Sequence, residues 1–323
     1  MKVNTDMEIC LAKNQIHLYG YESYFKSFVQ LLEKKRLANS VLLTGQKGLG
    51  KSTFIYHLIN YFLSANQNNK YSINDFLINS ENHTYNLITQ NIHPNFYLVE
   101  NEDINRDIKI DQIRNLKKFI NKSTYNQDLK IILIDNAENL NLNSANSLLK
   151  SVEEPSINTY FFIIHNNPYT ILPTLKSRCN EFKIHFSMDD KKRILSKLLQ
   201  QYKFDLNADK IFQNYYFETP GNLIKYLSFF HNDDFDLNKF TNESIIYLLE
   251  NYSNKKNPFF LSFLKAYIMK FFNLLFISDK NNFYINSFKY SKILNHIENL
   301  KKYNLNEKIT FLAIQNILNN EAR

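Results

Sequence analysis

A glycine-rich loop between a short apolar run and a helical run constrains the fold of this chain more than any other feature. The loop reads Gly45-Gln46-Lys47-Gly48-Leu49-Gly50-Lys51-Ser52, which fits G-x-x-x-x-G-K-[ST] at every defined position. It follows the apolar residues 41–43 and opens a helical pattern that we expect from Lys51 to about Ser64. A strand, this loop and a helix in that order predict a P-loop fold, although the pattern fits many such folds.

The residue types of the loop suit the phosphates of a nucleotide. Glycines let backbone N–H groups turn toward an anion, and the helix that begins at Lys51 directs the positive end of its dipole there. The Lys51 ammonium would reach the β and γ phosphates, and the Ser52 hydroxyl would bind Mg²⁺. The sequence therefore predicts ATP and Mg²⁺ as ligands, with a relic loop as the alternative. The predicted nucleotide-binding residues of this segment are Gly45, Gly48, Gly50, Lys51, Ser52 and Thr53.

An acidic residue at the end of a second apolar strand is the other requirement of a P-loop ATPase. Residues 130–134 read KIILI and lead to Asp135, which we expect to hold Mg²⁺ through its water shell. A capping role at the strand end is the alternative. A glutamate directly after the aspartate would orient the attacking water, but Asn136 stands there and its amide cannot act as a base. Glu138 lies two positions further on. Hydrolysis by this chain alone is therefore expected to be weak or absent.

Strands and helices alternate over the first part of the chain. The strands 130–134 and 160–164 are apolar throughout, which predicts an α/β fold with a parallel sheet covered by helices on both faces. Beyond residue 186 only helical patterns follow. We therefore predict three domains with the boundaries 1–186, 187–235 and 236–323. Further strands and helices are expected at 21–37, 95–99, 111–121, 144–153, 188–202, 222–231, 244–251, 257–277 and near 286–320.

Charge, cysteine content and hydropathy limit the functional classes. The net charge of +8 and the pI near 9.1 suit a polyanionic partner, although AT-rich codons favour lysine in any protein. Cys10 and Cys179 are far apart, so neither a Cys-rich metal site nor a structural disulfide is expected. The beginning of the sequence does not resemble a signal peptide, and no run of about 20 apolar residues is found. We expect a cytoplasmic protein with no membrane partner.

Two segments after the acidic strand narrow the class of P-loop protein to which the chain can belong. Residues 144–155 read SANSLLKSVEEP, and the tripeptide Ser177-Arg178-Cys179 follows LPTLK. Together with LYGY at 18–21 and DQIR at 111–114, they resemble the clamp-loader subunits of the AAA+ superfamily, in order from residue 16 to about 230. The resemblance implies an AAA+ P-loop domain, a small helical lid domain and an all-α C-terminal collar that oligomerises.

The resemblance also implies roles for individual residues. Arg178 would be an arginine finger that reaches the ATP of a neighbouring subunit, with a surface ion pair as the alternative. Asn166 would be a polar sensor of the γ-phosphate, in a register that its neighbour Asn167 leaves open by one residue. Cys179 is expected to be a small packed residue, because no histidine partner for a nucleophile lies nearby in the sequence.

Some positions separate the subunit types within this family. Motor subunits carry an arginine soon after a glycine of the lid, whereas Gly221 is followed by Ile224 at that position here. With Asn136 after the acidic strand, the chain is most similar to the delta-prime family of bacterial DNA polymerase III. Many members of that family carry a four-cysteine zinc module, but residues 65–92 contain no cysteine, so no zinc is expected.

The implied partners are the other subunits of a heteropentameric ring, a sliding clamp and primed DNA. An ATP-hydrolysing motor subunit of the same loader, an independent AAA+ remodeller and a structural scaffold with a relic loop are the alternatives. Helices that face the chamber of such a ring contact the DNA backbone through basic and small polar residues. Candidate DNA contacts, each with solvated surface as the alternative, are Lys117, Lys118, Lys122, Asn143 and Ser144.

Overall fold

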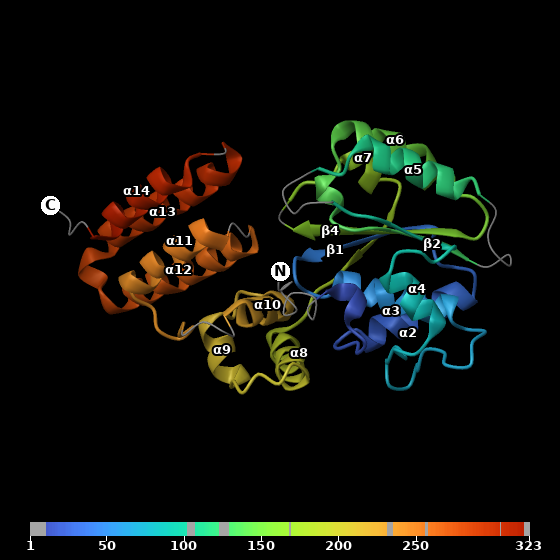
Figure 1. The fold of residues 1–323 in the computed structure, drawn as a ribbon, viewed down its shortest axis with the longest axis horizontal. Coiled ribbons are helices and arrows are strands. Elements are labelled where there is room, and N and C mark those ends of the chain that lie inside the picture. The colour runs from blue at the N-terminus through green and yellow to red at the C-terminus, as the bar shows by residue number, and fades with distance from the viewer. Residues whose placement is uncertain are drawn as a thin grey trace. The chain divides into compact units, whose positions relative to one another are not determined.

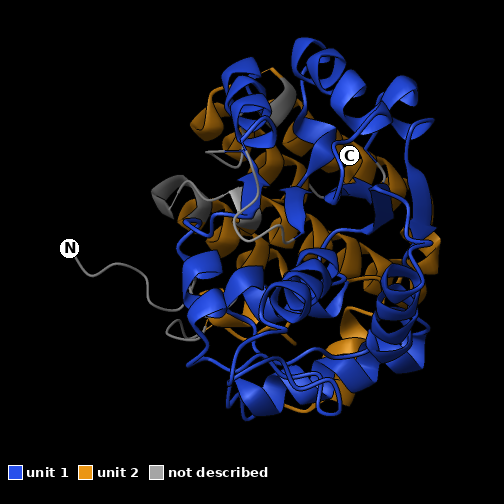
Figure 2. Ribbon diagram, turned by 90° about the vertical axis from the view of Figure 1, so that its right-hand side faces the viewer, with its two compact units in different colours: residues 1–205, 219–225 blue, residues 206–218, 226–323 orange. Residues whose placement is uncertain are grey.

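The computed structural model describes residues 11–101, 107–122, 129–167, 169–230, 235–255, 258–303 and 305–319. The chain divides into two compact units (Figure 2). Unit 1 contains residues 1–205 and 219–225, and unit 2 contains residues 206–218 and 226–323. The division into three domains at 186 and 235 stays a prediction.

Unit 1 is built on a five-stranded sheet in the order β2-β3-β4-β1-β5, in which every neighbouring pair is parallel. The predicted parallel sheet is therefore confirmed. Residues of β3 are buried throughout, since helices cover both faces. The strands are β1 (Ser40–Gln46), β2 (Phe96–Val99), β3 (Lys130–Ile134), β4 (Thr159–Asn167) and β5 (Asn180–Lys183).

Helices cover the sheet in two layers (Figure 1). Alternate residues of a strand point to opposite faces, so Val41 and Leu43 of β1 pack in one core and Leu42 in the other. The first core lies against α2 (Glu22–Glu33), α3 (Lys51–Leu63) and α4 (His83–Thr89). The second lies against α5 (Ile110–Ile120), α6 (Leu142–Glu153) and α7 (Pro173–Lys176). Helix α8 (Met188–Gln201) completes the long helices of this unit.

Several short elements were not predicted from the sequence. Strand β5 reads NEFK and lies at the edge of the sheet with both end residues exposed, so it lacks the apolar run of a central strand. Helix α4 lies within residues 65–92, where no helix was predicted. It begins after Asn82, whose side chain accepts a hydrogen bond from the Tyr85 N–H. Helix α9 (Ala208–Asn214) is a further short helix, in unit 2.

Unit 2 is helical in its described residues, and aromatic side chains form much of its core. Phe263 of α12 contacts the rings of Phe230, Tyr226 and Tyr267. The stretch predicted near 286–320 consists of two helices, α13 and α14. The helices are α11 (Asn242–Lys255), α12 (Pro258–Ser278), α13 (Phe283–Lys302) and α14 (Glu307–Asn319); α10 (Pro220–Phe230) begins in unit 1 and ends in unit 2.

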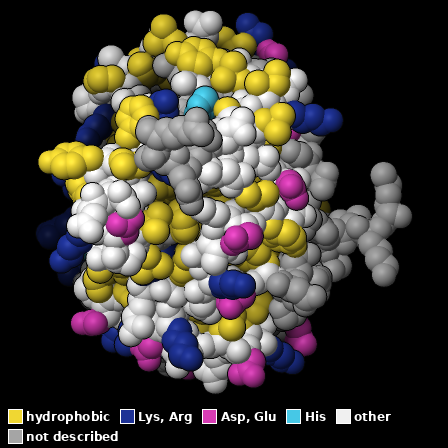
Figure 3. Space-filling view, turned by 90° about the vertical axis from the view of Figure 1, so that its left-hand side faces the viewer, with side chains coloured by type: hydrophobic (Ala, Val, Ile, Leu, Met, Phe, Trp, Pro, Cys, Tyr) yellow, Lys and Arg dark blue, Asp and Glu magenta, His cyan; other side chains and the backbone are white. Residues whose placement is uncertain are grey.

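Helix α12 contains a segment, Phe260–Ser278, that is long and apolar enough to cross a membrane by length and composition. Half of its most apolar stretch is buried inside the protein, and the core helix of a soluble protein meets the same criteria of length and composition. Unit 2 also exposes apolar side chains, among them Tyr284 and Phe288 of α13 and Ile309 of α14. Figure 3 shows hydrophobic side chains in several groups over one face of the molecule.

Candidate nucleotide-binding site

The glycine loop joins β1 to α3 at the carboxyl end of the sheet. Gly48 and Gly50 have φ values of +83° and +86°, a left-handed conformation that glycine adopts without strain. Helix α3 begins directly afterwards at Lys51, which directs its N-terminal N–H groups into the loop. Since Gly45 pairs with Asn166 of β4, the loop lies beside the predicted sensor residue. This arrangement fits an anion of the size of a phosphate chain.

The ammonium of Lys51 is buried and fully hydrogen-bonded. Its side chain nitrogen donates to the carbonyl oxygens of Gly45 at 2.9 Å and Gln46 at 2.7 Å, and to Asn166 Oδ1 at 2.9 Å. These three bonds use all three N–H groups of a lysine. Burial lowers the pKa of Lys51 to about 8, although the nearby carboxylates of Asp135 and Glu138 act in the opposite direction.

Ser52 and Asp135, the residues predicted to bind Mg²⁺, contact each other. The Ser52 hydroxyl donates to Asp135 Oδ2 at 2.8 Å, and the Asn136 N–H donates to Asp135 Oδ1 at 2.9 Å. Burial raises the pKa of Asp135, whereas these two hydrogen bonds and Lys51 lower it. A hydroxyl and a carboxylate at the end of β3 are the kind of oxygen ligands that Mg²⁺ prefers. The residues present therefore fit a magnesium ion bound together with nucleotide phosphates.

Asn166 connects Lys51 with the residues after β3. Its Nδ2 donates to Asn136 Oδ1 at 2.9 Å and to Glu138 Oε1 at 2.8 Å, and its backbone N–H donates to Glu138 Oε2 at 3.1 Å. Asn166 is 4% exposed whereas Asn167 is exposed, so Asn166 is the asparagine that faces the loop. Both oxygens of Glu138 are engaged by Asn166. No local pattern in the sequence indicates this pairing, because it depends on how β4 lies beside β3.

The beginning of α10 contacts the glycine loop within unit 1. The Thr219 hydroxyl donates to the Lys47 carbonyl at 2.9 Å, and the Gly221 N–H donates to the Gly48 carbonyl at 3.0 Å. A side chain at position 221 would come within 2.6 Å of the Gly48 oxygen, so only glycine fits. Ile224, three residues later, is buried. Sequence reasoning noted Gly221 and Ile224 but missed this contact with the loop.

Arg178 lies at the other end of the sheet from the glycine loop. It stands two residues before β5, whose first residue, Asn180, pairs with Val41 near the start of β1. The loop follows the opposite end of β1, roughly 16 Å away along the strand. The Arg178 Nε donates to Glu153 Oε2 at 2.8 Å, and Nη1 donates to the Thr174 carbonyl at 3.0 Å.

The candidate DNA contacts differ in exposure. Lys118, Lys122 and Asn143 are exposed, and Lys117 is half-buried. Ser144 is fully buried, and its hydroxyl donates to the Ile108 carbonyl at 2.8 Å. Its selection as a DNA contact is therefore wrong, because its side chain stabilises the junction between α6 and the segment before α5.

A buried histidine and a cysteine of unit 1 have structural contacts. His57 is buried: its Nε2 donates to the Gln15 carbonyl, and its Nδ1 accepts from the Tyr71 hydroxyl, each at 3.0 Å. Burial lowers the pKa of His57 to about 3. Cys179 is partly buried against the second core, and this burial raises the pKa of its thiol to about 11. The thiol is therefore a poor nucleophile. Cys10 lies outside the described residues. Within them, no cluster of three His, Cys, Asp or Glu residues suits a metal ion.

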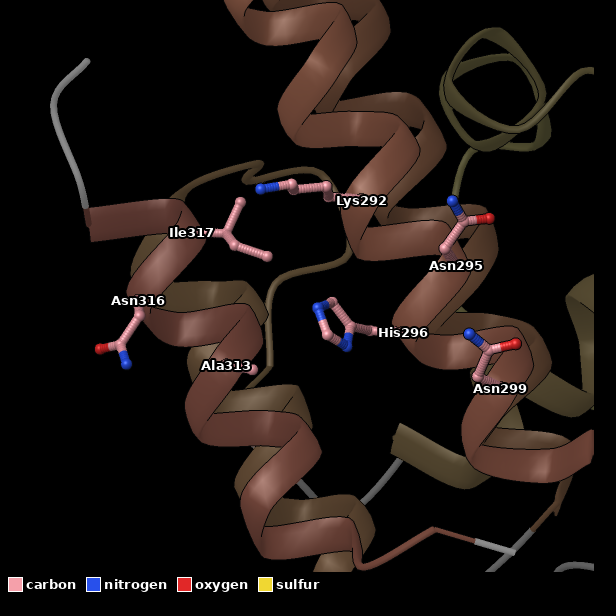
Figure 4. Close-up of a pocket in the computed structure, with 7 residues that line it drawn as sticks. All are labelled: Lys292, Asn295, His296, Asn299, Ala313, Asn316 and Ile317. Carbon is pink, nitrogen blue, oxygen red and sulfur yellow. The ribbon is translucent and has the colours of Figure 1, made fainter. Parts of the chain in front are cut away.

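Unit 2 has a groove of its own between α13 and α14, with a volume of about 380 Å³ (Figure 4). Lys292 and His296 of α13 project beside Ile317 and Ala313 of α14. None of the site residues predicted from the sequence lines it. The lining residues are Lys292, Asn295, His296, Asn299, Ala313, Asn316 and Ile317.

Fold and site together define a class of protein. A parallel sheet in the order β2-β3-β4-β1-β5, with the glycine loop after β1 and the acidic residue after β3, is an AAA+ P-loop domain followed by helices. Residues 20–187, a little over half of the chain, match the family model described as DNA polymerase III, delta subunit. The chain belongs to this family.

Curated relatives carry the name DNA polymerase III subunit delta'. The protein of Pseudomonas aeruginosa is 33% identical over 150 residues, which are 46% of this chain and 44% of the relative. That of Bacillus subtilis is 30% identical over 173 residues, 53% of this chain and 48% of the relative. The alignments span somewhat less than half of these relatives. A solved gamma subunit-related protein of Thermotoga maritima aligns over 91% of this chain and 97% of its own, with 14% identity and a TM-score of 0.42. The predicted resemblance to the delta-prime family is confirmed.

Proposed function

We propose that this chain is a delta-prime-like subunit of a DNA polymerase III clamp loader. In this role it binds ATP and Mg²⁺ in its glycine loop and supplies Arg178 to the active site of a neighbouring subunit. The ring that it joins opens a sliding clamp and places it on primed DNA in the cytoplasm. Family membership supports the complex, and the geometry of the described residues supports the two roles of this subunit.

The position of Arg178 is the observation that carries the proposal. The glycine loop lies at the carboxyl edge of the sheet, and Arg178 lies at the amino edge, before β5. An arginine at that edge cannot reach a phosphate held by the glycine loop of its own chain. Its side chain is 32% exposed, so it is accessible to a second protein. If the guanidinium of Arg178 contacts ATP, that ATP is bound by a neighbouring subunit.

The site is suited to binding more than to hydrolysis. Lys51 lies beside the glycine loop and Ser52 contacts Asp135, an arrangement that supports the binding of nucleotide phosphates and Mg²⁺. Asn136 cannot take a proton from water, and both oxygens of Glu138 accept hydrogen bonds from Asn166. ATP would add its own negative charge beside the buried Lys51 and supply phosphate oxygens to Mg²⁺. The alternative, a hydrolysing motor subunit, would need a base directly after Asp135, where this chain has Asn136.

The test measures ATP turnover with Arg178→Ala, both for the chain alone and for the loader reconstituted with its other subunits, clamp and primed DNA. Arg193→Ala is the matched control, because Arg193 is also on the surface of unit 1 and is ion-paired, with Asp190. We expect little turnover by the chain alone, and a loss of loader activity in Arg178→Ala but not in the control.

Nucleotide binding is measured separately, by titration of the chain with ATP and Mg²⁺. Lys51→Ala should weaken the binding strongly without removing it, because the backbone N–H groups of the loop and Mg²⁺ still hold the phosphates. Strong turnover by the isolated chain that does not depend on Arg178 would show a motor subunit or an independent ATPase. An absence of ATP binding would leave a structural subunit with a relic loop.

A further inference from the structure

We propose that Glu153 is a positioning residue for the arginine finger: its carboxylate holds the guanidinium of Arg178 so that the outer nitrogens are directed toward a neighbouring subunit. The inference rests on the proposed trans role of Arg178. It is carried by the contact of Glu153 Oε2 with Arg178 Nε at 2.8 Å.

The way in which the guanidinium is bound leaves its outer edge available. Glu153 takes the inner nitrogen, Nε, and the Thr174 carbonyl takes one hydrogen of Nη1 at 3.0 Å. A guanidinium has five N–H donors in a fixed planar arrangement. The second Nη1 hydrogen and both Nη2 hydrogens therefore remain for a phosphate while Glu153 stays in place. A carboxylate bound to the outer edge would instead compete with the phosphate.

Both partners are attached to rigid parts of unit 1. Glu153 is the last residue of α6, and the Val152 carbonyl beside it accepts a 2.7 Å hydrogen bond from the Ser40 hydroxyl at the start of β1. Arg178 follows α7, which is anchored by the fully buried Leu175. Attachment to rigid elements holds a functional side chain in one orientation, as catalysis requires.

The stability of α6 does not explain a carboxylate at this position. A negative charge at the C-terminal end of a helix is disfavoured by the helix dipole. A cation nearby would offset this effect. Besides Arg178, Lys150 lies one helical turn before Glu153, and Lys176 lies two residues before Arg178. Lys176 pairs with Glu181, and Lys150 has no ion pair in the part of the chain that the structure describes. Arg178 is the cation that Glu153 contacts, although both side chains are partly exposed.

The test uses the reconstituted loader with clamp and primed DNA, and compares Glu153→Gln with Glu154→Gln. Glu154 is the next residue and is exposed, and within the described residues it forms no ion pair. An exposed pair makes a modest contribution, so we expect Glu153→Gln to lower the Arg178-dependent part of ATP turnover about two- to fivefold. The KM for ATP should change little, because an arginine finger stabilises charge that develops in the transition state. Glu154→Gln should match the unmodified protein.

Epistasis separates positioning from a general structural effect. In the Arg178→Ala background, Glu153→Gln should cause no further loss, since Glu153 acts only through Arg178. Glu153→Asp keeps the charge but shortens its reach, and should also lower turnover, which gives a second test if Glu153→Gln folds poorly. A loss from Glu153→Gln that persists without Arg178 would overturn the inference.

The remaining outcomes distinguish this inference from the proposed function. If Arg178→Ala lowers turnover and both Glu153→Gln and Glu153→Asp behave like Glu154→Gln, the finger stands and the positioning role of Glu153 fails. If Arg178→Ala itself has no effect on the loader, the proposed function fails and the inference fails with it.

Discussion

Removal of the Asn166 side chain tests whether the hydrogen bonds between the glycine loop and β3 hold the site together. Asn166 accepts from Lys51 and donates to Asn136 and Glu138, with distances of 2.8–2.9 Å. The variant Asn166→Ala removes these three bonds. The exposed neighbour Asn167 provides the control, Asn167→Ala, at the next position of the same strand.

The magnitude follows from the burial of each partner. A hydrogen bond to a charged group contributes ~1.5–3 kcal/mol to stability, and a hydrogen bond between neutral groups ~1 kcal/mol. The loss is largest when the remaining partner is buried and finds no other hydrogen-bond partner. Asn136 and Glu138 are half-buried, so water replaces part of what they lose. Lys51 is 3% exposed and loses one of three acceptors. We therefore expect Asn166→Ala to lower the free energy of unfolding of unit 1 by about 2–4 kcal/mol, and Asn167→Ala by less than about 0.5 kcal/mol.

The assay is a urea titration in which hydrogen exchange of the amides in β1 and α3 is followed. This observable is chosen because the two units can unfold separately, and a signal averaged over the chain would mix them. The slope with urea should be unchanged, so that the midpoint alone shifts. If the two alanine variants differ by less than about 0.5 kcal/mol, the network does not stabilise the site and the reasoning from burial is wrong.

Four further predictions concern the same unit. The affinity for ATP should fall above pH 8, about tenfold per pH unit, because Lys51 has a pKa of about 8 in the free protein and must be protonated to bind phosphate. ATP titrations from pH 7 to 9.5 measure this dependence, which should be lost in Lys51→Ala. The pKa of Lys51 in the folded protein, about 8, lies below its ordinary value of 10.5, so the unfolded chain binds more protons between pH 8 and 10.5. The free energy of unfolding of the ATP-free protein should therefore rise over this pH range. Gly221→Ala would place a carbon 2.6 Å from the Gly48 oxygen and should cost ~1–3 kcal/mol in urea unfolding. Ser144→Ala removes a buried hydrogen bond and should cost ~1–3 kcal/mol in the same assay, while the exposed neighbour Asn143→Ala should have little effect.

Local features of the sequence determined the elements that carry the chemistry. The glycine loop is specified by glycines, a lysine and a serine or threonine at fixed spacing, and β3 by an apolar run that is followed by Asp135. Such signals depend on a few consecutive residues, so they can be read without the fold. The parallel sheet was predictable for the same reason, because strands buried on both faces are apolar throughout.

Only the tertiary structure decided which distant residues meet. Strand β5 could not be predicted because an edge strand needs no apolar run, yet its place beside β1 puts Arg178 at the end of the sheet away from the glycine loop. Ser144 seemed a surface residue because its neighbours are polar, but the fold buries it against Ile108. The pairing of Glu153 with Arg178 joins residues 25 positions apart. Contacts of this kind depend on the order of strands and the packing of helices, which no local pattern specifies.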